Sequence, residues 1–244
     1  MTDQADACAI EPKRSRSEPL LGPLAFLVAV DADLRPLLRE VRRQAQPVYQ
    51  NQWLRAFRFG SGTETVAWGG PVLGAPQAVL LLEKLVALGA RRILFLGWAG
   101  SLDPGLKPGD LFLPLRAVSE EGTSRLYTPE PDPQAPQGWT GAIASALGES
   151  GWSWRTGTIW TTDAPYRETW GKIAAYRAAG VAAVDMETAA LFTVGAFRKV
   201  AVASLLIISD ELSGPRWRHG FRDPRFREAR SRLQEWLLQR AIRL

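Results

Sequence analysis

The chain has 244 residues, of which 46% are apolar and 23% are charged, an ordinary composition for a globular protein whose length suits one large α/β domain. Its single cysteine, Cys8, excludes a disulfide framework within the chain and gives no support to a cysteine metal site. Its single histidine, His219, excludes a zinc site built from several imidazoles, so no metal is expected.

The N-terminal residues are polar, mixed in charge and interrupted by prolines. This pattern predicts a flexible tail over residues 1–22 and a single domain over residues 23–244. The apolar run over 20–30 contains Gly22 and Pro23 and is too short to span a bilayer. Its neighbours do not resemble a signal peptide, so we expect a cytoplasmic protein without a membrane partner.

Short apolar runs alternate with helical patterns in the first half of the domain. The predicted elements are, in chain order, a buried strand over 25–30, a helix that Asp31 caps, a strand pair over 53–59 and 65–68, a helix over 74–88 that Gly89 closes, and a buried strand over 93–96. The glycine-rich residues 97–101 follow this last strand.

The alternation continues in the second half. The predicted elements are a turn at 108–110, a strand over 111–114, a proline-rich loop over 129–137, a helix over 139–149, a strand over 155–160, a helix over 166–179, a strand over 181–184, a helix over 186–197, a strand over 200–208 and a last helix from Pro224. Strands that alternate with helices predict one α/β sandwich around a central sheet.

The C-terminal segment is strongly basic, with nine arginines and three acids from Gly214 onward. A basic tail is one signal of nucleic-acid binding. The apolar residues of this segment recur at helical spacing, at Phe226, Ala229, Leu233, Trp236 and Leu237. We therefore predict an amphipathic closing helix with a solvated arginine face and no nucleic-acid partner.

Acidic residues follow the ends of two predicted strands. The apolar strand residues 203–208 lead into Ser209 and Asp210. Asp185 and Glu187 stand at the start of the helix after another buried strand. Ligands of open α/β sheets bind at the carboxyl ends of strands, so these residues are candidates for a site. Each carboxylate could instead cap a helix or a turn, which requires no ligand.

Two segments resemble the paired signature of the nucleoside phosphorylase and nucleosidase superfamily, namely Val184–Leu191, which reads VDMETAAL, and Ile208–Asp210. Other parts occur in the order that this family has. They are a glycine-rich turn at 69–76, a glycine loop at 97–102, a PGD turn within 106–110, a segment at 121–124 and a base-pocket segment at 161–166. The resemblance covers about residues 24–240 and implies a single-domain, three-layer α/β sandwich with a central mixed sheet.

The resemblance implies an enzyme that cleaves the N-glycosidic bond of a nucleoside. Such an enzyme stabilises the positive charge that builds on the ribose and the negative charge that builds on the base. Glu187 would accept hydrogen bonds from the ribose hydroxyls, and Met186 would pack against the ribose. Asp210 would donate a proton or a hydrogen bond to N7 of the base. Pyrimidine-specific relatives usually lack this aspartate, so its presence favours a purine-type base.

Several residues are candidates for contacts with the base. Tyr166 or Trp160 would stack on it, with Ser209 in the same part of the site, although a tryptophan in a chain with ten of them more often fills a core. In purine relatives an arginine from the loop after Asp210 assists that residue. The candidates for this role are Arg216, Arg218 and Arg222.

The residues that would hold phosphate as a co-substrate depart from the family pattern. Arg35 falls near the position of one phosphate-binding arginine, and Gly97 opens the glycine loop. Phe95 stands where the second arginine is expected, and Trp98 replaces a hydroxyl residue. Phosphate held without paired cations binds weakly.

Hydrolytic relatives activate water with a carboxylate after the first strand. Asp33 matches that position, and Asp31 is a second candidate, although both could instead serve the helix N-terminus. The acceptor, phosphate or water, therefore stays open, and so does a nucleoside-binding module that has lost catalysis. No organic cofactor is implied. By resemblance we expect a small-molecule nucleoside as the partner and a homodimer or a hexamer as the assembly.

Overall fold

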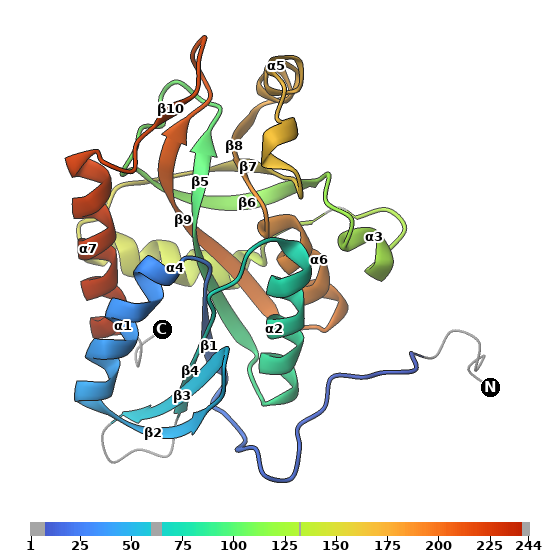
Figure 1. Cartoon of the computed structure of the whole chain (residues 1–244), viewed down its shortest axis with the longest axis vertical. Coiled ribbons are helices and arrows are strands. Elements are labelled where there is room, and N and C mark those ends of the chain that lie inside the picture. Colours follow the sequence, from blue (N-terminus) through green and yellow to red (C-terminus); the bar gives the residue numbers. More distant parts are fainter. Residues whose placement is uncertain (1–7, 60–64, 132, 241–244) are drawn as a thin grey trace.

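The computed structural model describes residues 8–59, 65–131 and 133–240, and one mixed sheet lies at its centre (Figure 1). The strands of this described part are β1 (Leu24–Val28), β2 (Ala45–Gln50), β3 (Leu54–Phe59), β4 (Thr65–Gly69), β5 (Arg92–Ser101), β6 (Leu111–Ser119), β7 (Trp154–Thr161), β8 (Val181–Asp185), β9 (Ala201–Glu211) and β10 (Arg218–His219). Their order across the sheet is β10-β9-β6-β7-β8-β5-β1-β4-β3-β2, with a further pairing between β9 and β5.

Strand β5 belongs to two parts of this sheet at once. Its first half pairs with β1, and its whole length pairs with β9 in parallel. Its last two residues, Gly100 and Ser101, pair with β8 in the antiparallel sense. Because β9, β6, β7 and β8 also pair in sequence, these strands close into a ring with β5. The ring brings the ends of β8 and β9 to the same edge of the molecule.

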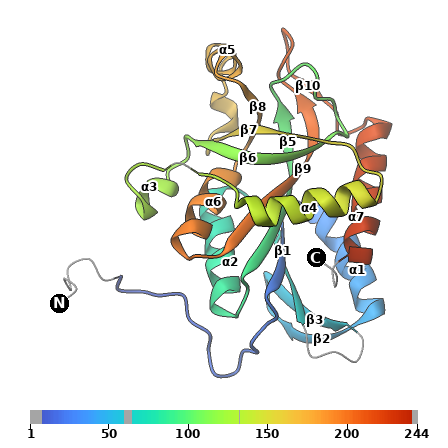
Figure 2. The same ribbon diagram turned by 180° about the vertical axis from the view of Figure 1, so that it is seen from behind.

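Helices cover both faces of the sheet. They are α1 (Asp31–Gln44), α2 (Ala75–Ala87), α3 (Ser124–Tyr127), α4 (Gln137–Glu149), α5 (Trp170–Ala178), α6 (Thr188–Phe197) and α7 (Pro224–Arg240), and a 3-10 turn, η2 (Pro165–Arg167), precedes α5. The apolar residues of α2 and α6 share one core, and those of α1, α4 and α7 share another. Figure 2 shows α4 running across the second face beside α7. The predicted α/β fold with a central mixed sheet is confirmed.

The closing helix α7 has the predicted amphipathic pattern. All five apolar residues expected at helical spacing are buried, namely Phe226, Ala229, Leu233, Trp236 and Leu237. Arg225, Arg227 and Arg232 are exposed on its other side. Three of the nine arginines of the C-terminal segment therefore lie on a solvated helix face.

The glycine-rich residues 97–101 differ from the expected loop, because β5 continues through them to Ser101. A glycine often marks a loop, but within a strand it also leaves room for neighbouring side chains. A Cβ on Gly97 would stand 3.0 Å from the Phe95 ring, and a Cβ on Gly100 would stand 3.0 Å from Leu212. These glycines therefore allow close packing inside the ring. The short elements β2, α3 and β10 were also not predicted.

Residues 8–22 contain no helix or strand but are attached to the domain. Lys84 forms an ion pair of 2.6 Å with Glu18, and the Leu21 N–H donates to the Leu88 carbonyl at 2.6 Å. Arg198 forms an ion pair of 3.1 Å with Glu11. The first seven residues of the predicted tail lie outside the described residues. Within the described ranges, no helix has both the length and the apolar character that crossing a bilayer requires.

Candidate active site

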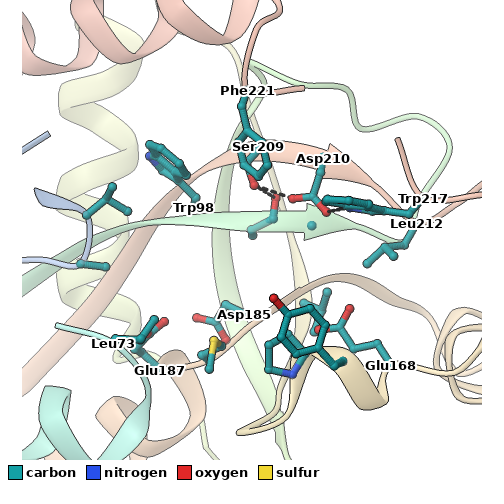
Figure 3. A pocket seen from close by; sticks show the side chains of 18 of the residues that line it. Leu73, Trp98, Glu168, Asp185, Glu187, Ser209, Asp210, Leu212, Trp217 and Phe221 are labelled. Atoms are coloured by element: carbon teal, nitrogen blue, oxygen red, sulfur yellow. Dashed lines mark hydrogen bonds between the residues drawn. The ribbon is translucent and has the colours of Figure 1, made fainter. Parts of the chain in front are cut away.

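A cavity of about 820 Å³ opens where β1, β5, β8 and β9 come together (Figure 3). It is also lined by the turn after β4, by the segment from η2 into α5, and by the hairpin between β9 and β10. Eight of the residues singled out from the sequence line it, namely Asp31, Trp98, Tyr166, Asp185, Met186, Glu187, Ser209 and Asp210. The fold thus gathers residues from five separate stretches of the chain into one space.

Asp210 reaches the cavity because the pairing of β9 with β5 contains a bulge. Ala99 pairs with Ile208, and Gly100 pairs with Asp210, so Ser209 has no partner of its own on β5. In a regular strand, successive side chains point to opposite faces. A bulge changes the direction of the side chains after it. Ser209 and Asp210 therefore both line the cavity.

Two neutral groups donate hydrogen bonds to the Asp210 carboxylate. The Ser209 hydroxyl donates to Oδ1 at 2.6 Å, and the Trp217 indole N–H donates to Oδ2 at 2.8 Å. Figure 3 shows both hydrogen bonds on the upper side of the cavity. Each carboxylate oxygen has a second lone pair, so Asp210 can still bind a group in the cavity.

Glu187 lies across the cavity from Asp210, together with Asp185 (Figure 3). Only 6% of Glu187 is exposed, and the Gly74 N–H donates to its Oε1 at 2.7 Å. Burial raises the pKa of Glu187, and the nearby charge of Asp185 adds to the rise. A hydrogen-bond donor or a positive charge brought by a ligand would favour the ionised form of this buried carboxyl and bind to it.

Asp185 serves the turn that carries Glu187. It accepts hydrogen bonds from the Thr161 hydroxyl at 2.7 Å and from the Thr188 N–H at 3.0 Å. Thr188 is the first residue of α6, so Asp185 satisfies one of the free N–H groups at that helix start. Burial raises the pKa of Asp185 as well. Both carboxyl groups thus line the cavity, but Asp185 is bonded to the start of α6, whereas Glu187 is the one available to a ligand.

Asp33 lies outside the cavity, behind Trp98. The Trp98 indole N–H donates to Asp33 Oδ2 at 2.7 Å. Arg230 donates to Oδ1 at 2.7 Å, and Gln234 donates to the same oxygen at 3.0 Å. The Arg230 guanidinium also lies 4.9 Å from the Trp98 ring. Asp33 is thus occupied by a cluster that fastens α7 to α1, and we do not assign the activation of water to it.

Three other residues assigned to the site from the sequence also lie outside the cavity, namely Arg35, Trp160 and Gly97. The side chain of Arg35 is 76% exposed and forms an ion pair of 2.7 Å with Asp31. Asp31 itself does line the cavity, and it is the first residue of α1 rather than its cap. Trp160 is fully buried and stacks on Tyr176 at 4.4 Å. Gly97 lies inside β5, where its missing side chain makes room for Phe95.

A family model described as the Phosphorylase superfamily matches residues 23–243. The chain belongs to this superfamily. The resemblance stated from the sequence is therefore confirmed at the level of the superfamily. Because the match covers nearly the whole chain, the cavity described above lies within the superfamily's domain.

Curated relatives of this superfamily member are more distant. The purine nucleoside phosphorylase DeoD-type of a Bacillus cereus strain is 29% identical over 146 residues, which are 59% of this chain and 62% of the relative. The protein of the same name from Bacillus thuringiensis (strain Al Hakam) has the same identity and coverage. The aligned part thus spans less than two thirds of these relatives.

A solved structure shows the same fold. The crystal structure of purine nucleoside phosphorylase from Toxoplasma gondii in complex with immucillin-H aligns with a TM-score of 0.77 over 90% of each chain. The sequences are 22% identical, so this likeness concerns the fold alone.

The cavity of this phosphorylase superfamily member is rich in carboxyl groups. They belong to Asp31, Glu168, Asp185, Glu187 and Asp210. None of the lysines, arginines and the histidine in the described ranges lines it. Arg218, one of the candidates for assisting Asp210, instead lies 3.8 Å from the Glu211 carboxylate as an ion pair. The titratable groups that line the cavity are therefore acids, although the net charge of the chain is +5.

Sequence reasoning missed Glu168 and Trp217. Glu168 stands between η2 and α5, where the sequence predicted one continuous helix. Its side chain is half-buried and lines the cavity, and no hydrogen bond or ion pair with another described residue reaches its carboxylate. Burial, followed by the charges of Asp210 and Glu120, raises the pKa of Glu168 to about 7. Trp217 stands between Arg216 and Arg218, which the sequence singled out, but no local sequence pattern predicts its hydrogen bond with Asp210.

Proposed function

We propose that this superfamily member cleaves the N-glycosidic bond of a purine-type nucleoside. One observation carries the proposal: Glu187 and Asp210 face each other across a single cavity that is large enough for a nucleoside (Figure 3). Cleavage separates charge, since the ribose becomes positive and the base becomes negative. A carboxylate on one side and an acid on the other match that separation.

Five of the residues that line the cavity have roles in this proposed reaction. Glu187 accepts hydrogen bonds from the ribose hydroxyls and stabilises the positive sugar, and Met186 packs beside the ribose. The bond between C1′ and the base nitrogen breaks, and its electron pair stays with the base. Asp210 gives a proton to the base as it leaves, which is general acid catalysis. Tyr166 stacks on the base, and Glu168 offers it a second carboxyl group.

We further propose water as the acceptor. Phosphate entering the cavity would find no cation among the described residues that line it. Water needs no such partner. Its oxygen bonds to C1′ and its proton passes to Asp31, which lines the cavity at the end of the first strand. The products are then free purine and free ribose. Asp31 then releases its proton to solvent and Asp210 takes one up, so both carboxyl groups return to their starting forms.

Phosphorolysis is the second candidate, and the names of the curated relatives favour it. It would require a cation from outside the described lining residues, for example from a second copy of the chain. The expected homodimer or hexamer stays a prediction, as does the cytoplasmic location.

The deciding experiment is a panel of purine and pyrimidine nucleosides, incubated with and without phosphate and assayed for free base by chromatography. We expect release from purine nucleosides at the same rate in both conditions. Release that requires phosphate would overturn the choice of water. Tight binding without any release would instead support a binding module that has lost catalysis.

A further inference from the structure

We propose that Trp217 is the positioning residue for Asp210, holding its carboxylate toward the base and stabilising the charge that Asp210 gains when it gives up its proton. This inference rests on the proposed function, because it assumes that Asp210 is the acid. The sequence pointed to an arginine of the same loop for this task. The observation that changes the assignment is the hydrogen bond of 2.8 Å from the Trp217 indole N–H to Asp210 Oδ2.

The hairpin between β9 and β10 fixes where the indole lies. His219 pairs with Asp210 in the antiparallel register, and the Gly220 N–H donates to the Ser209 carbonyl at 2.8 Å. A Cβ on Gly220 would lie 2.5 Å from Pro108, so the hairpin is also pressed against the turn before β6. Trp217, two residues before His219, is therefore held close to Asp210 by backbone contacts of its neighbours.

Aromatic contacts hold the indole further. Trp217 contacts His219 with ring centres 5.8 Å apart, and the rings of His219 and Phe221 lie nearly parallel at 6.2 Å. These residues alternate along the chain, so they share one side of the hairpin. Phe221 in turn contacts Trp98 at 5.8 Å. Trp217 and Phe221 both line the cavity, and together they form one wall of it.

An indole differs from an arginine in a way that suits this acid. A positive guanidinium beside Asp210 would favour the carboxylate form before the reaction, when a proton is needed on the acid. The indole N–H is neutral, and it strengthens as a partner when Asp210 becomes negative. The contribution of Trp217 therefore grows as the bond breaks, which raises kcat rather than the affinity for the nucleoside.

The test is the variant Trp217→Phe, which keeps an aromatic ring and removes the N–H. For an ordinary purine nucleoside we expect kcat to fall about tenfold or more, with KM changed by less than about threefold. For a purine nucleoside that carries a methyl group on N7, the departing base needs no proton at that nitrogen. We expect Trp217→Phe and the unaltered protein to cleave this second substrate at equal rates.

Trp53→Phe is the matched control. Trp53 is similarly exposed, at 52% beside 54% for Trp217, but it does not line the cavity. We expect Trp53→Phe to leave kcat unchanged on both substrates. If Trp217→Phe lowers kcat equally on both substrates, the role of Trp217 is structural only and the inference is overturned.

A further variant, Asp210→Asn, separates this inference from the proposed function. If Asp210→Asn retains full activity on the ordinary substrate, the proposed acid is wrong. If Asp210→Asn is inactive while Trp217→Phe is fully active, the acid stands and Trp217 is wrong. Trp217→His restores a ring N–H, and we expect it to recover part of the lost kcat. Trp217→His also serves as the test if Trp217→Phe does not fold. In that case a kcat of Trp217→His no higher than that of Trp217→Gly would overturn the inference.

Discussion

Two aspartates near the start of α1, Asp31 and Asp33, have different surroundings although they are only two residues apart. Asp31 lines the cavity, whereas Asp33 lies behind Trp98 and pairs with Arg230. The sequence favoured Asp33 because it matches the position at which hydrolytic relatives carry their water-activating carboxylate, while both aspartates fit a helix start. The partner that distinguishes them comes from α7, at the other end of the chain, so no local pattern could reveal it.

The pair Asp31→Asn and Asp33→Asn tests this division. Asp33→Asn breaks a mostly buried ion pair with Arg230, so we expect the free energy of unfolding to fall by about 2 kcal/mol with turnover changed less than about twofold. Asp31→Asn breaks only an exposed pair with Arg35, so stability should change by less than about 1 kcal/mol while turnover falls at least about tenfold. Denaturant titration and steady-state rates measure both. The reverse pattern of rates would return the activation of water to Asp33.

Glu168 gives a pH-dependent signature in stability. Its pKa rises from the usual 4.5 to about 7, first through burial and then through the charges of Asp210 and Glu120. The cation Lys172 is paired with Glu120. Between these values the folded chain binds more protons than the unfolded chain. The contribution of Glu168 to the free energy of unfolding is therefore complete below pH 4.5 and is lost as the pH rises through about 7.

Glu168→Gln removes this titration. From about pH 5 to about pH 8, we expect the free energy of unfolding of the unaltered protein to fall more than that of Glu168→Gln. Denaturant titrations of both proteins at the two pH values give the comparison. Equal losses would show that Glu168 does not titrate in this window and would remove it as a neutral donor to the base.

At the scale of elements, the site depends on the register between β5 and β9. The sequence predicted an apolar strand that ends in Ser209 and Asp210, and the structure places both within β9. The bulge that turns both residues toward the cavity arises from pairing with β5, which begins about a hundred residues earlier in the chain. Strand patterns predict that such strands exist, but long-range pairing decides the register.

Gly100→Ala tests this element. The new Cβ would stand 3.1 Å from Asp210 Oδ2 and 3.0 Å from Leu212, so both side chains would shift by a few tenths of an ångström. We expect kcat to fall about tenfold, because small displacements of a reacting group are costly. Gly141→Ala is the control, since Gly141 lies in α4 with no atom within 4 Å of the added Cβ. It should raise the free energy of unfolding by up to about 1 kcal/mol and leave kcat unchanged. An unchanged kcat in Gly100→Ala would show that Asp210 tolerates displacement.

At the scale of the whole molecule, the sequence predicted the fold class and the superfamily, and both are confirmed. The order of strands and helices follows from local patterns, and the short motifs lie where the ring of strands brings chain segments together. Local sequence patterns did not predict which residues line the cavity. The chain carries a net charge of +5, yet its cavity lining holds five carboxyl groups, because the ring collects acids that lie far apart in the sequence.

The central claim is that Glu187 and Asp210 act together on one nucleoside. The most direct measurement is the rate of free purine release in phosphate-free buffer by the unaltered protein, by Glu187→Gln and by Asp210→Asn. Glu187→Gln suits the purpose because its amide oxygen can still accept the hydrogen bond from Gly74. We expect release by the unaltered protein and a loss of about 100-fold or more in each variant. A full rate in either variant, or no release from any purine nucleoside by the unaltered protein, would contradict it.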